Sequence, residues 1–242
     1  MAQLGFKSNT GVVREKNEDA CFVIPSHDVY VVADGVGGNN AGEIASRTAV
    51  QGVAEYVTEV PIEGCETDEE ICSYFLDCIA EINQQVYRLG HEHRENRGMA
   101  TTLVLAYLRN DKAYIMNVGD SRAYLLRNNE MEQLTEDHTY VNELVRSGVI
   151  TKEEAETHSQ RNVITRAIGA APFVKTDFYR VPIQSDDILM LCSDGLYGEV
   201  EEQQLVEILK KDESMSQMCN LLVDAAIAGG GRDNITVICL KI

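Results

Sequence analysis

Residues 101–127 read TTLVLAYLRNDKAYIMNVGDSRAYLLR, and this segment gives the first indication of the fold. It contains three runs rich in β-branched, aromatic and aliphatic residues, which are Thr102–Leu108, Ala113–Val118 and Ser121–Arg127. Only residues 109–112 and 119–120 separate these runs. Because connections this short cannot hold a crossover helix, we expect three neighbouring antiparallel strands.

The segments on either side of these strands have helical or strand-like patterns. Apolar residues recur every three or four positions in 44–57 and more strongly in 69–89, which predicts two helices. Val29–Ala33 reads as a buried strand that runs into a turn. Further on we expect strands at 187–193 and 234–242, with helices near 201–210 and 215–228 between them. Antiparallel strands with segregated helices indicate an α+β layered fold.

Length, charge and cysteine content limit the class of protein. The 242 residues contain no linker and no internal repeat, which indicates one domain over 1–242. The 21 Lys and Arg against 39 Asp and Glu give a net charge of −18, which argues against nucleic acid or an anionic membrane as the main partner. No uncharged apolar run approaches the roughly 18 residues of a membrane helix. The 7 Cys are odd in number, no Cys-x-x-Cys occurs and we find no signal peptide, so we expect a reduced, cytoplasmic location.

Four aspartates lie where expected strands end, beside Gly, Ser or Asn. They are Asp34, Asp120, Asp194 and Asp233. Carboxylates held there, with small neighbours that leave backbone carbonyls accessible, suit cations that prefer oxygen ligands. Asp-Gly is also a common turn dipeptide, so each aspartate taken alone is better explained as a turn residue, and it is the occurrence of four in one domain that favours a cation site.

Other enzyme chemistries lack their sequence signatures. The Gly-rich segment 34–42 has neither the spacing of a P-loop nor a following Lys. No Cys is followed by Arg six positions later, as a thiol phosphatase requires, and no G-x-S-x-G occurs. The 5 His form neither HExxH nor a zinc-ligand pattern.

Seven short motifs occur in a fixed order from residue 14 to residue 237. They are Arg14-x-x-Asn17-Glu18-Asp19, Asp34-Gly35-Val36-Gly37-Gly38, Gly98-Met99-Ala100-Thr101-Thr102, Gly119-Asp120-Ser121-Arg122, Asn162-Val163-Ile164-Thr165-Arg166-Ala167-Ile168-Gly169, Ser193-Asp194-Gly195 and Asp233-Asn234-Ile235-Thr236-Val237. The set resembles the metal-dependent Ser/Thr protein phosphatases of type 2C in their compact bacterial form, over nearly the whole chain.

The resemblance implies a fold and a metal centre. The fold is two packed antiparallel β-sheets flanked by helices, an αββα sandwich, with a flap at about 138–172 beside the active site. Asp34 would bridge two Mn²⁺ or Mg²⁺ ions, and the Gly35 carbonyl would bind one of them. Asp194 and Asp233 would hold the other ion, and water would fill the remaining positions.

The resemblance gives four further residues a role. Glu18 and Asp19 would position metal-bound waters, and Asp120 would share a third, looser ion with Asp194. Arg14 would grip the substrate phosphate. From the residues alone, Arg14 fits a surface ion pair, and Asp120 fits a pair with Arg122 or a turn cap.

The implied reaction is hydrolysis of phosphoserine and phosphothreonine in proteins. Two divalent ions can lower the pKa of a bridging water from 15.7 towards ~7, so that hydroxide attacks phosphorus in line without a phosphoenzyme. The partner would be a phosphorylated protein, a Ser/Thr kinase or its targets, and we expect a monomeric enzyme.

The chain departs from the family pattern at three places. Val36 follows the metal-binding Asp-Gly where some relatives have a His that protonates the leaving group, and Asn39-Asn40 stand where bacterial relatives often have a His. A metal-bound water is then the expected proton donor. Ala100 replaces the commoner Gly of its motif, which we interpret as a packing change.

Two other hypotheses remain open. One is a metallophosphatase acting on a small molecule or nucleotide. The other is a degenerate, inactive member that acts as a binding module, although Asp34, Asp194, Asp233 and Arg14 are all retained.

Overall fold

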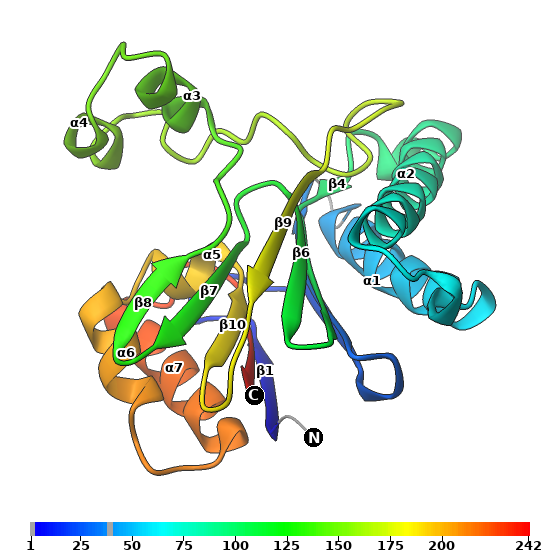
Figure 1. The fold of residues 1–242 in the computed structure, drawn as a ribbon. Coiled ribbons are helices and arrows are strands. Elements are labelled where there is room, and N and C mark those ends of the chain that lie inside the picture. Colours follow the sequence, from blue (N-terminus) through cyan, green and yellow to red (C-terminus); the bar gives the residue numbers. More distant parts are fainter. Residues whose placement is uncertain (1–2, 38–40) are drawn as a thin grey trace.

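The structure, a computed structural model, describes residues 3–37 and 41–242 as two antiparallel β-sheets packed face to face, with helices on both outer faces (Figure 1). The first sheet has the strand order β1-β11-β10-β7-β8, and the second has the order β2-β3-β5-β6-β9, with the short β4 paired to β3. The predicted α+β fold, an αββα sandwich, is confirmed. The strands are β1 (Gln3–Asn9), β2 (Asp19–Ile24), β3 (Val29–Val36), β4 (Ala100–Thr101), β5 (Leu103–Arg109), β6 (Lys112–Val118), β7 (Arg122–Arg127), β8 (Glu130–Gln133), β9 (Asp177–Pro182), β10 (Ile188–Cys192) and β11 (Ile235–Lys241).

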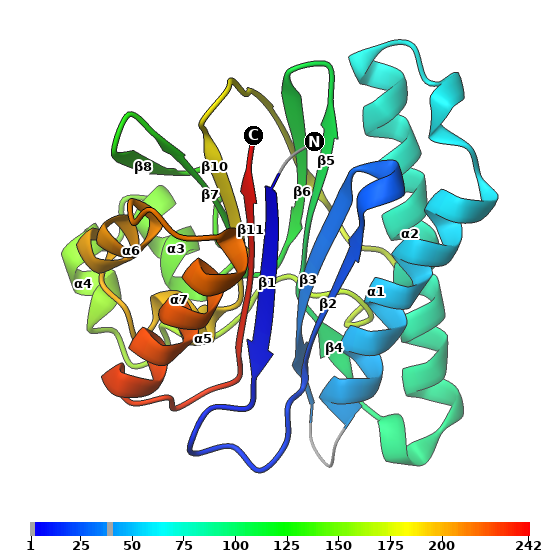
Figure 2. The ribbon, with the colours of Figure 1, turned by 90° about the horizontal axis from the view of Figure 1, so that it is seen from below.

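Helices cover each outer face, and two short ones project from one end. Seen from below, α1 and α2 lie against the sheet of β3, and α6 and α7 lie against the sheet of β11 (Figure 2). Helices α3 and α4 belong to a long excursion off the sandwich (Figure 1). The helices are α1 (Ala41–Glu59), α2 (Asp68–Glu92), α3 (Tyr140–Arg146), α4 (Lys152–Glu156), α5 (Asp194–Tyr197), α6 (Glu202–Leu209) and α7 (Met215–Gly229). None of the described helices has the length and apolar character needed to cross a membrane.

Strand β3 shows why the central strands read as continuous apolar runs. Val29, Val31 and Ala33 pack on the layer of α1 and α2, while Tyr30 and Val32 pack between the two sheets. A strand buried on both faces has no polar face and therefore shows no alternation. The predicted strand at 29–33 and the helices at 44–57 and 69–89 are confirmed, with slightly longer bounds.

One expectation about strand order is wrong. β5 and β6 pair antiparallel as predicted, but β6 next pairs with β9, whereas β7 lies in the other sheet between β10 and β8. The chain changes sheets at Gly119, whose φ of +105° lies in the region that favours glycine. A Cβ there would lie 2.6 Å from Thr102 Cγ2. A connection of three residues, 119–121, excludes a crossover helix, but it does not require that the two strands pair.

Candidate active site

The four aspartates come together at one end of the sandwich. Asp34 lies in β3, Asp120 follows β6, Asp194 opens α5 after β10, and Asp233 precedes β11. All four line one cavity of about 240 Å³. Both sheets therefore contribute carboxylates to one site, as the sequence predicted, even though the four residues are spread over 200 positions of the chain.

Three other predicted residues, Arg14, Glu18 and Gly35, line the same cavity. Asp19 does not line it: it is buried on β2, directly opposite Asp34 in the strand register. Its Oδ2 accepts a hydrogen bond of 2.7 Å from Ser193, the residue before Asp194. Asp19 therefore lies behind the cavity wall.

The carboxylates raise one another's pKa. Burial, followed by repulsion from neighbouring carboxylates, raises the pKa of Asp120 to about 7 and that of Asp194 to about 6. The pKa of Asp34 is also raised well above its usual value, for the same two reasons. For Asp19, burial raises the pKa to about 7 against hydrogen bonds from Ser193 and Thr236 that lower it. Such a cluster has more negative charge than its surroundings neutralise, and a bound cation would relieve this.

Two buried carboxylate oxygens, Asp194 Oδ1 and Asp19 Oδ1, have no hydrogen-bond partner among the residues that the structure describes. Buried oxygens of this kind are rarely left unpaired unless an ion or water serves them. Gly35 is held by its backbone, since its N–H donates to the Glu18 carbonyl at 3.1 Å. A Cβ on Gly35 would lie 2.2 Å from the Gly42 carbonyl oxygen, so a side chain would displace this backbone. The donor set is therefore oxygen-rich and fits a hard divalent cation.

Arg14 is the one basic side chain among the described residues that line this cavity. It lies in the loop between β1 and β2 and is 50% exposed, and its Nη2 donates to Asp233 Oδ2 at 2.7 Å. Arg14 thus makes an ion pair with a neighbouring acid, as the interpretation from the residues alone predicted. The partner, however, is one of the four site carboxylates.

Sequence reasoning gave Asn234 no role, yet its side chain fixes the loop that carries Arg14. Asn234 Nδ2 donates to the carbonyls of Thr10 and Lys16 at 2.9 Å each, and Oδ1 accepts from the Glu18 N–H at 2.8 Å. Its position in the motif after Asp233 was the available signal. The contacts span more than 200 residues, and only the fold reveals them.

Asp120 is only 5% exposed and does not pair with Arg122. The Arg122 guanidinium instead binds Asp137 through Nε and Nη2, at 2.6–3.1 Å. The Asp120 carbonyl accepts a hydrogen bond of 2.9 Å from the Tyr197 hydroxyl. The ion-pair alternative for Asp120 is therefore wrong.

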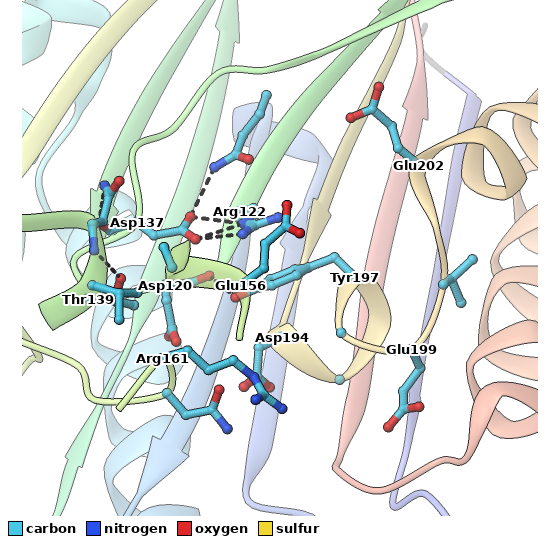
Figure 3. A pocket seen from close by; sticks show the side chains of 18 of the residues that line it. Asp120, Arg122, Asp137, Thr139, Glu156, Arg161, Asp194, Tyr197, Glu199 and Glu202 are labelled. Atoms are coloured by element: carbon cyan, nitrogen blue, oxygen red, sulfur yellow. Dashed lines mark hydrogen bonds and ion pairs between the residues drawn. The ribbon is translucent and has the colours of Figure 1, made fainter. Parts of the chain in front are cut away.

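A larger cavity of about 780 Å³ adjoins the first and shares Asp120, Asn162, Asp194 and Asp233 with it. It lies between α3 and α4 on one side and α5 and α6 on the other, with Arg161 and Glu156 on the flap side (Figure 3). The sequence did not predict this groove.

The departures from the family pattern are partly visible. Val36 lines the smaller cavity, so an aliphatic side chain occupies the position where some relatives have a His. Asn39 and Asn40 lie outside the described residues. Ala100 is buried and pairs with Val36 through the short strand β4, which agrees with a packing role.

Comparisons with known proteins agree with this fold and site. A family model described as Protein phosphatase 2C matches residues 12–228. The chain is 40% identical over 239 residues to a serine/threonine phosphatase stp of Listeria welshimeri, covering 98% of this chain and 94% of that protein. It is 39% identical over 211 residues to the protein phosphatase PhpP of Streptococcus pneumoniae, covering 86% of this chain and 83% of that protein.

Solved structures are also similar along their whole length. The serine/threonine phosphatase of S. agalactiae has a TM-score of 0.92 at 31% identity, covering 100% of both chains. The catalytic domain of the phosphatase PstP in complex with two manganese ions has a TM-score of 0.87 at 30% identity, covering 99% of this chain and 97% of that one. The chain belongs to the protein phosphatase 2C family. Within that family it is a hydrolase, a protein-serine/threonine phosphatase.

Proposed function

We propose that this chain hydrolyses phosphoserine and phosphothreonine in proteins with the help of two Mn²⁺ or Mg²⁺ ions. The observation that carries this proposal is the buried carboxylate cluster with an unpartnered Asp194 oxygen. The PstP structure with two manganese ions supports the choice of metal. The proposed catalytic domain spans residues 1–242, with a flap at about 138–172.

We assign the ligands residue by residue. Asp34 would bridge both ions, the Gly35 carbonyl would bind one, and Asp194 and Asp233 would hold the other. Among residues 3–37 and 41–242, no three His, Cys, Asp or Glu side chains are close enough to hold an ion by themselves. Water would therefore complete the coordination, positioned by Glu18 and, from behind the cavity wall, by Asp19. Asp120 would share a third ion with Asp194.

When bound, the ions would supply Lewis acidity and would lower the pKa of bound water, so that hydroxide is available at neutral pH for in-line attack on phosphorus. The residues of the chain do the rest. Arg14 would turn its planar guanidinium to the phosphate oxygens, for which it has the matching geometry. Val36 cannot give a proton, so water would protonate the leaving alkoxide.

The groove supports a protein substrate over a small molecule. The larger cavity, of about 780 Å³, adjoins the smaller one and is lined by Asp120, Asp194 and Asp233, which leaves room for residues on either side of a phosphorylated one. We propose a phosphoprotein partner, either a Ser/Thr kinase or its targets. The enzyme would then oppose the action of that kinase. We further propose a cytoplasmic, monomeric enzyme that uses neither nucleic acid nor membrane.

The test is phosphopeptide hydrolysis after chelation, with and without added Mn²⁺, compared with nucleotide hydrolysis at matched concentration. We expect Mn²⁺-dependent turnover that favours the phosphopeptide. Asp34→Asn and Asp194→Asn keep side-chain volume but remove a ligand charge, and should abolish nearly all turnover. Asp224→Asn, on the exposed face of α7, is the matched control. A tenth or more of the wild-type kcat in either site variant, a loss under ~1.4 kcal/mol, would contradict the ligand assignment.

A further inference from the structure

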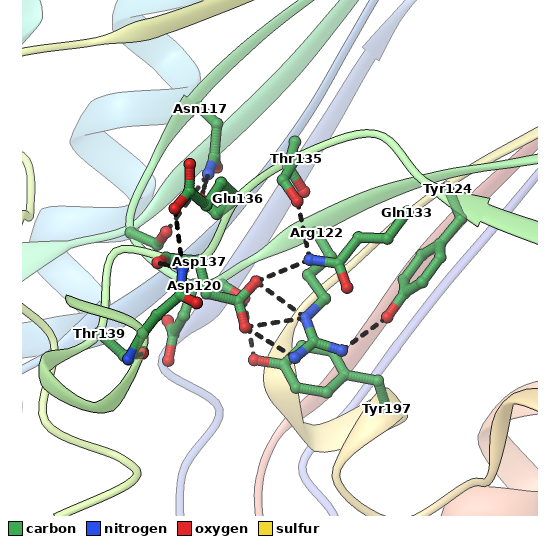
Figure 4. A network of polar contacts seen from close by, with 12 residues as sticks. Asn117, Asp120, Arg122, Tyr124, Gln133, Thr135, Glu136, Asp137, Thr139 and Tyr197 are labelled. Carbon is green, nitrogen blue, oxygen red and sulfur yellow. Dashed lines mark hydrogen bonds and ion pairs between the residues drawn. The ribbon is translucent and has the colours of Figure 1, made fainter. Parts of the chain in front are cut away.

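A network of polar contacts lies between the larger cavity and the interior, and it is centred on Arg122 (Figure 4). Arg122 Nη1 donates to the Tyr124 hydroxyl at 2.8 Å, while Nε and Nη2 bind Asp137. The guanidinium also lies over the ring of Tyr197, with its carbon 3.6 Å from the ring centroid. The hydrogen bonds and the ring contact of Arg122 therefore go to groups other than Asp120.

Tyr197 links this network to the turn that carries Asp120. It is the last residue of α5, the one-turn helix that Asp194 opens, and its hydroxyl donates to the Asp120 carbonyl at 2.9 Å. The Asp120 carboxylate follows directly from the backbone that Tyr197 holds. One short helix thus presents Asp194 at its start and fixes Asp120 from its end.

The same turn is also held by the root of the flap. The Gly119 N–H donates to His138 Nδ1 at 3.0 Å, and the His138 N–H donates to the Gly119 carbonyl at 3.0 Å. Asp137, the residue before His138, is the one that binds Arg122. The turn at 119–120 therefore lies between two supports, α5 through Tyr197 and the flap root through His138, and Arg122 joins these supports to each other.

We propose that Tyr197 is a positioning residue that sets the Asp120 carboxylate against Asp194, and that Arg122 ties this position to the root of the flap. The geometry carries the proposal, because the Tyr197 hydroxyl, on the helix that Asp194 opens, donates a hydrogen bond to the backbone carbonyl of Asp120. Its catalytic consequence rests on the proposed role of Asp120 as a ligand. The link between the Tyr197 hydroxyl and the Asp120 backbone does not rest on that role.

Tyr197→Phe removes only the hydroxyl and keeps the ring under Arg122. Tyr124→Phe is the matched control, because it removes a hydroxyl from the other tyrosine that contacts the same guanidinium but does not contact Asp120. Two measurements apply to both variants. The first is amide hydrogen exchange at Gly119 and His138 in the metal-free protein. The second is the Mn²⁺ concentration that gives half of the thermal stabilisation and half of the phosphopeptide turnover.

For Tyr197→Phe we expect exchange at Gly119 and His138 to be about three- to tenfold faster and the half-effect Mn²⁺ concentration to rise by a similar factor, the size expected for one lost hydrogen bond. Tyr124→Phe should lower thermal stability but leave both quantities as in the wild type. Equal behaviour of the two variants would overturn the proposal and leave Tyr197 a merely structural residue.

Asp120→Asn separates this proposal from the proposed function. If that variant keeps the wild-type Mn²⁺ dependence, Asp120 is not a ligand and the catalytic consequence is overturned. The exchange measurement then still decides the link between the Tyr197 hydroxyl and the Asp120 backbone, and unchanged exchange in Tyr197→Phe would overturn that as well. If Asp120→Asn shifts the Mn²⁺ dependence and Tyr197→Phe does not, the ligand assignment stands and the positioning role is overturned.

Discussion

Arg14 illustrates how a single contact can agree with two interpretations. Its 2.7 Å contact to Asp233 is an ion pair on a half-exposed side chain, and exposed pairs contribute little to stability. The same contact places the guanidinium at the mouth of a cavity lined by four aspartates. A substrate phosphate in this cavity would meet a planar donor, and Arg14 can exchange its carboxylate partner, Asp233, for the phosphate.

Arg14→Ala should therefore raise KM for a phosphopeptide by about tenfold or more, the loss expected for one charge-assisted bidentate contact, with a smaller effect on kcat. Steady-state kinetics at saturating Mn²⁺ measure this. Arg47→Ala removes an arginine of similar exposure from an ion pair with Glu43 on α1 and should leave both parameters unchanged. An unchanged kcat/KM in Arg14→Ala would return Arg14 to the role of a surface ion pair.

The predicted site residues came from short motifs, and the motifs are local. Gly-Asp-Ser-Arg identifies Asp120, but nothing near it in sequence announces that Tyr197, 77 positions later, holds its carbonyl. Asn234 and Tyr197 were missed because their contacts cross from one strand end to another. The acidic residues could be predicted from the sequence, whereas the residues that hold the site in place, Asn234 and Tyr197, could be identified only from the fold.

At the scale of elements, the sequence predicted the inner strands and missed the outer ones. The strands that were not predicted are β1, β2, β8 and β9, which form the four sheet edges, and the two-residue β4. Edge strands are half-exposed and lack a continuous apolar run, as the largely exposed β8 shows. The change of sheet after β6 was missed for a related reason: β6 and β7 are both buried on two faces, so their patterns do not say which sheet each one joins.

The flap is anchored to β9 through a small polar cluster. Arg166 Nη1 donates to Asp177 Oδ1 at 2.9 Å, and His138 Nε2 lies 3.1 Å from Asp177 Oδ2. Because His138 Nδ1 accepts the Gly119 N–H, the proton of a neutral ring lies on Nε2 and is donated to Asp177. One carboxylate on β9 thus holds the flap at two points, residues 138 and 166.

Asp177→Asn keeps the volume of the side chain and removes the charge that both partners bind. We expect a loss of about 1–2 kcal/mol in the free energy of unfolding and faster proteolysis within 140–165. Denaturant unfolding and limited proteolysis measure the two effects. Asp186→Asn, in an exposed ion pair with Lys241, is the control and should cost less than about 0.5 kcal/mol. Proteolysis at the wild-type rate in Asp177→Asn would show that the flap is anchored elsewhere.

At the scale of the whole molecule, negative charge is the dominant feature. The chain carries a net charge of −18, and its sandwich gathers buried carboxylates from both sheets at one end. Without bound cations, repulsion between these carboxylates destabilises the folded state. These carboxylates therefore keep protons to a higher pH than usual, and protons and divalent ions compete for the same oxygens.

The stability of the metal-free protein should therefore fall as pH rises from 5 to 8. Burial and mutual repulsion raise the pKa of Asp19 and Asp120 to about 7 and that of Asp194 to about 6, against about 3.9 when unfolded. Between these values the folded chain binds more protons than the unfolded one, so this stabilisation is complete below about pH 4 and is lost as pH rises through 6–7. His138 acts in the opposite direction, since burial lowers its pKa from 6.5, but it is one group against several.

Melting temperatures measured with chelator and with Mn²⁺ across this range test the competition. We expect chelated protein to melt lower at pH 8 than at pH 5, and Mn²⁺ to restore stability most at pH 8, where fewer protons remain for it to displace. Asp194→Asn is neutral at every pH and should show a shallower decline with chelator and a smaller gain from Mn²⁺. Because Asp68, Asp177 and Asp187 have lowered pKa values, they titrate below this range and do not contribute to the slope. A melting temperature that stays level or rises from pH 5 to pH 8 in chelator would contradict the view that these carboxylates are short of positive charge.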